Sequence, residues 1–135
     1  MALLVRTASA ELSCDGDRSF EEATACTSVE GDLHVIGTPL TSLDELQNLT
    51  SVGGWLVVVG HTALASLAGL GALTAVGGGL LLIDNDALTE LDPLGSLSSV
   101  GGDGRVADNA ALADATGLCN TTIVGSIEIT VVGSG

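Results

Sequence analysis

One pattern occurs three times in succession, and this repetition restricts the possible folds more than any other feature of the chain. The three copies begin at Leu40, Leu64 and Leu88, with no residue between one copy and the next. Each copy has a leucine-rich first half, a Val-Gly-Gly step and a short second half. The period is roughly 24 residues, and fixed periods of about 20–50 residues are typical of a solenoid, in which each unit buries its apolar side only against its neighbours. The sequence therefore predicts a stack of similar coils.

Two partial copies extend the stack to about five coils. Residues 29–36 and 123–130 repeat only the second half of the pattern. Side chains there alternate between two faces, which is the period of a β-strand with one buried side, so the stack is a β-solenoid. The columns predicted to point inward are Leu33, Leu56, Leu80, Gly104 and Ile127 and, two residues later, Val35, Val58, Leu82, Val106 and Ile129. The outward column between them is His34, Val57, Leu81, Arg105 and Glu128.

The corners and the return path of each coil repeat as well. A glycine stands two residues before each first inward position, where the turn needs either a missing Cβ or a positive φ. After the strand, Asn85 and Asn109 share a place with His61 and Thr38, which predicts a partial ladder of polar side chains. Leucines three residues apart predict a single helical or 3₁₀ turn, with a capping box from Ser42 to Glu45. The glycines are Gly31, Gly54, Gly78, Gly102 and Gly125, and the leucines are Leu40, Leu43 and Leu46 with their later equivalents.

An N-terminal cap is predicted over residues 14–28. Ser19 followed by Glu22 forms a capping box, so a short helix should begin there. That helix would turn Phe20 and Ala23 inward. The cap replaces the first half of the first coil.

The state of the three cysteines indicates whether the protein resides in an oxidising compartment or in the cytosol. Cys14 and Cys26 bracket the cap helix, and a disulfide between them would contribute about 3 kcal/mol and indicate an oxidising environment. Two reduced, buried thiols in a cytosolic protein are the alternative. We expect Cys119 to be a buried core residue near the other end rather than a reactive thiol.

The charge of the chain excludes some classes of partner. Three basic residues against 17 acidic ones give a net charge of −14, and there is no lysine. Phosphate neutralisation needs clustered Lys and Arg, so nucleic acid and anionic membrane surfaces are poor partners. The simplest role of this charge is solubility, and salt, acid pH or divalent cations should then modulate self-association.

Residues 1–13 form a separate, apolar N-terminal segment. Residues 1–5 are apolar and residues 8–10 resemble the small-residue end of a secretory signal, but the apolar run is too short for a complete one. The segment is the remnant of a leader, an artificial start or a short strand that packs on something. No apolar run approaches the ~20 residues of a membrane helix, so membrane insertion is not expected.

No set of residues points to catalysis, a metal or a cofactor. His34 and His61 fall at different places in the repeat, and we expect both to be solvated on the surface. The acidic stretches 84–86 and 108–109 resemble calcium ligands, but turn formation explains them better, because Arg105 breaks the calcium-binding nonapeptide pattern. Two glycosylation sequons in form, at residues 48–50 and 120–122, would mean nothing in a bacterial protein.

The outward face of the middle strands is apolar where a polar face is expected. It holds the only tryptophan of the chain, and such a patch marks an interface in many soluble proteins. Another part of the chain, most simply residues 3–5, could instead cover it. A second interface is predicted at the C-terminal edge, residues 127–132, because an uncapped strand edge can template another chain. The predicted interface residues are Trp55, Val57, Val59, Leu81, Ile83 and Ile36.

The repeated motif, L-x-S-L-x-x-L-x-x-L-T-x-V-G-G-x-L-x-V, resembles that of the leucine-rich-repeat-like receptor L domain. This family occurs in growth-factor and insulin receptor ectodomains and in bacterial surface proteins. The resemblance covers residues 14–130, and Cys14 with Cys26 matches the family's disulfide-bearing cap. It implies a right-handed single-stranded β-helix, leucine-rich-repeat-like, that is extracellular and has no catalytic activity. The chain departs from the pattern at Gly104 and Ala107, where the core thins.

Two functions follow from these patterns. The first is a secreted or cell-surface structural module, with no enzymatic activity or cofactor, that acts through protein contacts and forms a homo-oligomer or fibre. The second is a ligand-recognition domain of receptor-L type that uses the same strand face. In both cases residues 1–13 form the N-terminal segment and residues 14–135 form the solenoid with its cap at 14–28.

Overall fold

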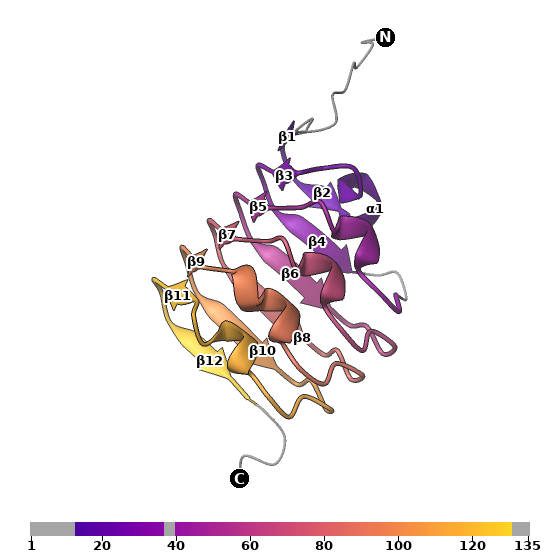
Figure 1. Ribbon diagram of the computed structural model, residues 1–135, viewed down its shortest axis with the longest axis vertical. Helices are drawn as coiled ribbons and strands as arrows, with labels where there is room; N and C mark the ends of the chain where they lie inside the picture. Colours follow the sequence, from indigo (N-terminus) through magenta and orange to yellow (C-terminus); the bar gives the residue numbers. More distant parts are fainter. Residues whose placement is uncertain (1–12, 37–39, 131–135) are drawn as a thin grey trace.

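The computed structural model describes residues 13–36 and 40–130. Within them, twelve strands form two six-stranded sheets in which every pairing is parallel. Each coil contributes one strand to each sheet, so paired strands come from successive coils (Figure 1). The fold is therefore solenoid-like, as the repeat predicted.

The two sheets differ in strand length. The odd-numbered sheet has strands of two residues: β1 (Ser13–Cys14), β3 (Ser28–Val29), β5 (Ser51–Val52), β7 (Ala75–Val76), β9 (Ser99–Val100) and β11 (Thr122–Ile123). The even-numbered sheet is longer: β2 (Arg18–Ser19), β4 (Leu33–Ile36), β6 (Leu56–Val59), β8 (Leu80–Ile83), β10 (Gly104–Ala107) and β12 (Ile127–Ile129). Because most even-numbered strands are long enough for side chains to alternate, this sheet presents a true outer face.

The return path of each coil contains a 3₁₀ turn, and these turns line up along one side of the stack (Figure 1). Their leucines are buried, as predicted. Ser42 Oγ accepts the N–H of Asp44 at 3.0 Å, two residues on, so a tighter turn stands where a capping box was expected. Asp114 plays the same part for Thr116. The turns are η1 (Asp44–Leu46), η2 (Ala68–Leu70), η3 (Asp92–Ser96) and η4 (Thr116–Leu118).

The core combines the predicted inward columns of β4, β6, β8 and β10 with the leucines of the return path and the valines of the odd-numbered sheet. Leu33, Leu56 and Leu80 are fully buried. A Cβ on Gly104 would meet Ile123 Cδ1 at 3.3 Å, so side chains of the last coil fill the space where the core was expected to thin. Ile127 and Ile129 keep the register of the inward columns, but the expected burial is wrong for both, because no further coil covers them within the described residues.

Close backbone approach explains the corner glycines. Among the described glycines, only Gly16 and Gly60 have positive φ. At Gly54, a Cβ would collide with the carboxylate of Asp32 and with the backbone of the previous coil. That carboxylate accepts the N–H of Trp55 at 2.7 Å. The missing Cβ, not a positive φ, is therefore what the corner requires.

The cap is more than the predicted helix. The helix α1 (Phe20–Ala23) is present, and Glu22 accepts the N–H and the hydroxyl of Ser19, as expected. The disulfide between Cys14 and Cys26 is confirmed. In addition, β1 and β2 pair with β3 and β4, so the cap supplies a sixth rung to the predicted five. The sequence carried a signal for it, because Gly16-Asp17 aligns with Gly31-Asp32.

Candidate interaction surface

The predicted interface residues lie together on the outer face of the even-numbered sheet. Strand register places Ile36, Val59 and Ile83 in one column and Val57 beside Leu81 in the next. Trp55 directly precedes β6 and faces outward with Val57, two residues on. We call these six residues, Ile36, Trp55, Val57, Val59, Leu81 and Ile83, the outer apolar face.

The outer apolar face is less open than its sequence indicated. Ile36 is 51% exposed, but Val57 is only 9% exposed. Trp55, Val59 and Leu81 are half-buried. Large side chains in adjacent strands shield one another, because parallel strands are only about 4.8 Å apart. The face is thus a packed apolar surface with an exposed edge at Ile36.

Trp55 is held against the backbone of the next coil. A Cβ on Gly79 would strike three atoms of the six-membered ring of Trp55, so the indole covers this residue. Gly79 is buried as a result. Gly79 directly follows the predicted corner glycine Gly78. It leaves room for the ring of Trp55, and the strand register, which places position 79 beside position 55, could have revealed this contact.

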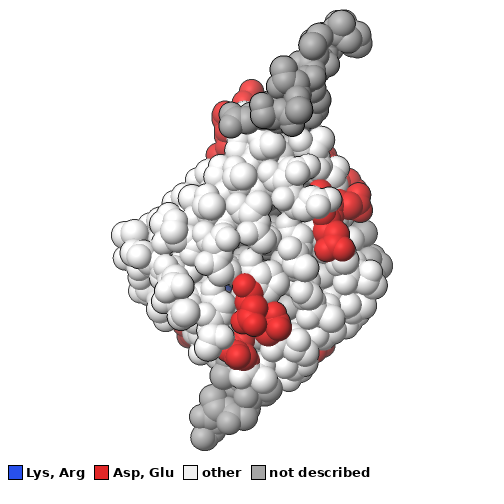
Figure 2. Space-filling view, in the orientation of Figure 1, with Lys and Arg blue, Asp and Glu red and all other residues white. Residues whose placement is uncertain are grey.

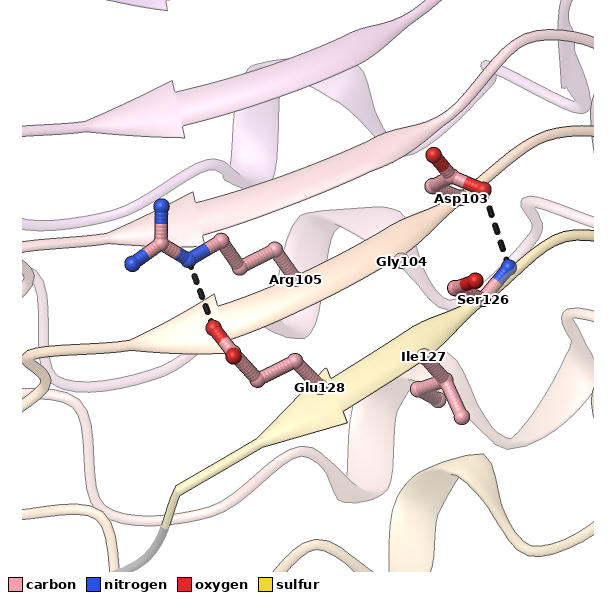
Figure 3. A pocket seen from close by; sticks show the side chains of 6 residues that line it. All are labelled: Asp103, Gly104, Arg105, Ser126, Ile127 and Glu128. Atoms are coloured by element: carbon pink, nitrogen blue, oxygen red, sulfur yellow. Dashed lines mark hydrogen bonds and ion pairs between the residues drawn. The ribbon is translucent and has the colours of Figure 1, made fainter.

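Charged side chains border the outer apolar face on both sides. Toward the cap, His34 Nε2 lies 3.9 Å from the Asp32 carboxylate. Toward the C-terminal end, Arg105 Nε donates to Glu128 Oε1 at 2.8 Å, with both side chains more than half exposed (Figure 3). Exposed pairs of this kind contribute about 0–1 kcal/mol to the free energy of unfolding. They therefore mark the boundaries of the outer apolar face but add little to the stability of the fold.

A shallow hollow lies next to the second of these borders. It has a volume of about 550 Å³ and lies between β10 and β12 (Figure 3). Its carboxylates have partners, since Asp103 accepts the N–H of Ser126 at 2.9 Å and Glu128 accepts from Arg105. This arrangement holds two neighbouring strands together.

The two histidines occupy different environments. His34 is half-exposed. His61 is 1% exposed, so the expectation of a solvated side chain is wrong for it. Its Nε2 lies 2.5 Å from the carbonyl oxygen of Val35, and its backbone N–H donates to Asn85 Oδ1 at 3.3 Å. His61 is buried because it occupies the ladder position, which points into the interior in every described coil. It is the first described member of that ladder.

The ladder continues through Asn85 and Asn109. Asn85 Nδ2 donates to the carbonyl of Val58 at 3.0 Å, and Asn109 Nδ2 donates to that of Leu82 at 2.8 Å. Asn109 Oδ1 in turn accepts the N–H of Asn85. Buried side chains therefore satisfy backbone groups of neighbouring coils, as the repeat predicted. Thr38 lies outside the described residues.

Turn formation accounts for the acidic residues that resembled calcium ligands. Asp84 and Asp108 have φ of 59° and 57°, at the position where Gly60 has 83°. Aspartate tolerates this left-handed conformation. Over residues 13–36 and 40–130, no group of three or more His, Cys, Asp or Glu could hold a metal ion.

Three further polar residues lie on the surface. Cys119 is exposed, so the prediction of a core residue is wrong. It follows the buried Leu118 at the end of η4, at a corner that Gln47 and Gly71 occupy in earlier coils and where both of those residues are exposed. Asn48 and Asn120 of the two sequons are both exposed.

Two carboxylates have a lowered pKa, and neither lies on the outer apolar face. The N–H and hydroxyl of Ser19 lower the pKa of Glu22. The N–H and hydroxyl of Thr116 likewise lower the pKa of Asp114. Both shifts arise from capping bonds that favour the ionised form, which is a structural role.

Comparisons with known proteins give no family for this chain. No family model matches it, and neither a curated protein nor a solved structure is similar to it. No helix in the described part of the chain is long and apolar enough to cross a membrane. The segment at residues 1–13, which was expected to be able to cover the outer apolar face, lies outside the described residues except for Ser13.

Proposed function

We propose that this protein is a non-enzymatic, secreted or cell-surface module that acts through protein–protein contacts made by the outer apolar face. In this proposal the two-sheet stack is a right-handed, leucine-rich-repeat-like β-helix. It presents a fixed surface and assembles with further copies into multimers or fibres. The observation that carries the proposal is the only tryptophan, packed over Gly79 on the outside of the sheet.

The position of Trp55 favours recognition over internal packing. Tryptophan is enriched at the centres of protein interfaces, where a large rigid side chain contributes much contact area. Here its ring is anchored on one side by Gly79 and its backbone N–H by Asp32, so binding would cost little side-chain ordering. A preformed apolar site of this kind is suited to binding the surface of another protein.

The net charge bears on how copies approach one another. Figure 2 shows the side of the stack that carries the 3₁₀ turns, where acidic side chains form separate patches with uncharged areas between them. The net charge of −14 keeps copies apart at long range, and salt screens it over about 8–10 Å. Contacts between copies should therefore strengthen as salt is added.

The disulfide supports the extracellular assignment. Bonds such as that between Cys14 and Cys26 persist in oxidising compartments and are rare in the cytosol of most organisms. The bond closes the cap at one end of the stack. Secretion is consistent with a module that must remain folded without chaperones.

Trp55 itself provides the test. The chain has one tryptophan and no tyrosine, so fluorescence excited selectively at the indole comes from the outer apolar face alone. We expect association at high salt to shift the emission to shorter wavelength and to reduce quenching by acrylamide at least about twofold. The molar mass is measured on the same samples by light scattering.

A matched pair of variants decides whether this face makes the contact. Ile36→Glu with Val59→Glu adds charge to the face and should leave Trp55 accessible at every salt concentration. Thr89→Glu adds charge at an exposed position elsewhere and should behave as wild type. Association of wild type with unchanged quenching of Trp55, or equal salt-dependent protection of Trp55 in the double variant, would reject the proposal.

Recognition of a different ligand by a receptor-L-like domain is the second candidate. The limited extent of the face favours it, since the pairs His34–Asp32 and Arg105–Glu128 bound it on both sides. A chain that stays monomeric with an accessible Trp55 at all salt concentrations would reject self-assembly through this face and favour recognition.

A further inference from the structure

The C-terminal end of the stack exposes side chains that belong to the core. Ile127 is 49% exposed and Ile129 is 37% exposed, whereas Leu80 and Leu82 in the same two columns are fully buried. Val124 at the adjacent corner is 73% exposed. These three residues, on and beside β12, form an apolar surface that is separate from the outer apolar face.

The backbone at this end is ready to pair with another strand. The N–H groups of Leu33, Leu56, Leu80 and Gly104 each donate to a carbonyl of the following coil, at 2.8–2.9 Å. Ile127 holds the equivalent position in β12, and alternation gives Ile129 the same orientation. Within the described residues no coil comes after β12. The N–H and C=O groups of Ile127 and Ile129 therefore project from an open sheet edge.

Charge makes this end the place where two copies can approach. The last coil, residues 112–130, contains two charged side chains, Asp114 and Glu128, and Arg105 pairs with Glu128. Residues 14–30 at the other end contain five acidic residues and one arginine. Because the chain as a whole is strongly acidic, the less acidic apolar end suits a second C-terminal end better than it suits the cap of another copy.

We propose that a second copy of this chain docks at the C-terminal end, with β12 of one copy antiparallel to β12 of the other. The two-fold arrangement is isologous, so Ile127 and Ile129 of each copy meet the same residues of its partner. The even-numbered sheets of the two copies then become one continuous sheet, and the exposed isoleucines become part of a continuous core. The dimer uses a different surface from the outer apolar face, so either interface can fail without the other.

The variant Ile129→Pro tests the open edge of β12 without disturbing the pairing of β12 with β10. The N–H of Ile129 points away from β10, so Ile129→Pro removes an edge donor and leaves the pairing of β12 with β10 intact. We expect the dissociation constant of the dimer, measured by sedimentation of the full chain, to rise at least about tenfold. Ile129→Val is the matched control and should dimerise as wild type. In the background of Ile36→Glu with Val59→Glu, where the outer apolar face does not associate, Trp55 fluorescence should stay unchanged while this dimer forms.

The variant Ile129→Lys keeps the backbone donor and places a charge on the apolar end, and it should weaken the dimer as well. It supplies the same test if the proline variant unfolds. A wild-type chain that remains monomeric at millimolar concentration and high salt would overturn the proposal. So would dimers of Ile129→Pro and Ile129→Lys as stable as those of wild type.

Discussion

The two ends of the stack are built from the same columns of residues and finish in opposite ways. At the N-terminal end, the cap adds β1 and β2 to the sheets, the disulfide between Cys14 and Cys26 ties them together, and Phe20 covers the core. At the C-terminal end, β12 is an exposed edge strand and its isoleucines are partly open to solvent. The repeat determines how coils stack, and the sequence outside the repeat determines which end is closed.

The charge of the two ends follows the same division. The cap is acidic, with Asp15, Asp17, Glu21, Glu22 and Glu30 against Arg18, whereas the last coil, from Leu112 onward, has only Asp114 and Glu128. Acidic groups at the closed end discourage the edge-to-edge addition that an open solenoid invites. The scarcity of such groups in residues 112–130 is what permits a second chain at the other end.

Equivalent truncations at the middle and at the open end should have very different costs. Leu80→Ala removes a fully buried side chain and should lower the free energy of unfolding by about 2–5 kcal/mol. Ile127→Ala, in the same column, should cost the monomer about 1 kcal/mol or less, because the side chain is 49% exposed. Urea denaturation of dilute samples measures both. Equal losses would mean that the open end is covered.

Breaking the disulfide tests the closed end. The double variant Cys14→Ser with Cys26→Ser should lose about 3 kcal/mol of stability, because the bond restricts the unfolded chain. Wild type in the presence of a reductant should unfold at the same urea concentration as the variant. A midpoint equal to that of oxidised wild type would show that the cap folds without its covalent tie.

The polar ladder allows a smaller and more selective test between the two ends. His61→Leu should lower stability by about 1–3 kcal/mol, because the carbonyl of Val35 loses its partner in a buried site. His61→Asn should retain most of that stability, since Asn85 and Asn109 make the equivalent bond in later coils. Thermal unfolding of the two variants compares them directly. An asparagine variant as unstable as the leucine variant would show that the ladder does not tolerate exchange between coils.

The smallest expected effect is on the pH dependence of the stability of the fold. The lowered pKa of Glu22 means that its capping bonds contribute stability above the unfolded pKa and that this contribution is lost as the pH falls through the folded pKa, below about pH 4. Asp114 should behave in the same way near the other end. Glu22→Gln and Asp114→Asn should each flatten the acid limb of the stability curve. Acid titrations identical to wild type in both variants would contradict these assignments.

The sequence predicted most of what repeats, together with the cap helix and its disulfide, but it misjudged two single residues. The inward columns, the 3₁₀ turns and the Asn85–Asn109 ladder all follow from a period that selects the same environment in every coil. His61 was misjudged because its residue type was weighed above its place in the ladder. Cys119 was misjudged because an apolar residue type was taken for a core position.

The outer apolar face shows the limit of prediction from a repeat. Alternation predicted the orientation of its side chains, but it could not predict that Trp55 would lie over Gly79 or that Val57 would be shielded by its neighbours. These contacts join side chains of successive coils and depend on their shapes. The sequence predicted an open C-terminal edge at residues 127–132, but it assigned Ile127 to the core, because the exposure of that side chain depends on whether another coil packs against it.

Amide hydrogen exchange of the full chain, at low and high protein concentration in high salt, tests the difference between the two ends most directly. We predict that the N–H groups of Ile127 and Ile129 exchange rapidly in dilute solution and become protected at high concentration, while those of Arg18 and Ser19 in β2 do not change. Exchange at β12 that is independent of concentration, or protection gained at β2 instead, would contradict the account of a closed N-terminal end and an open C-terminal end.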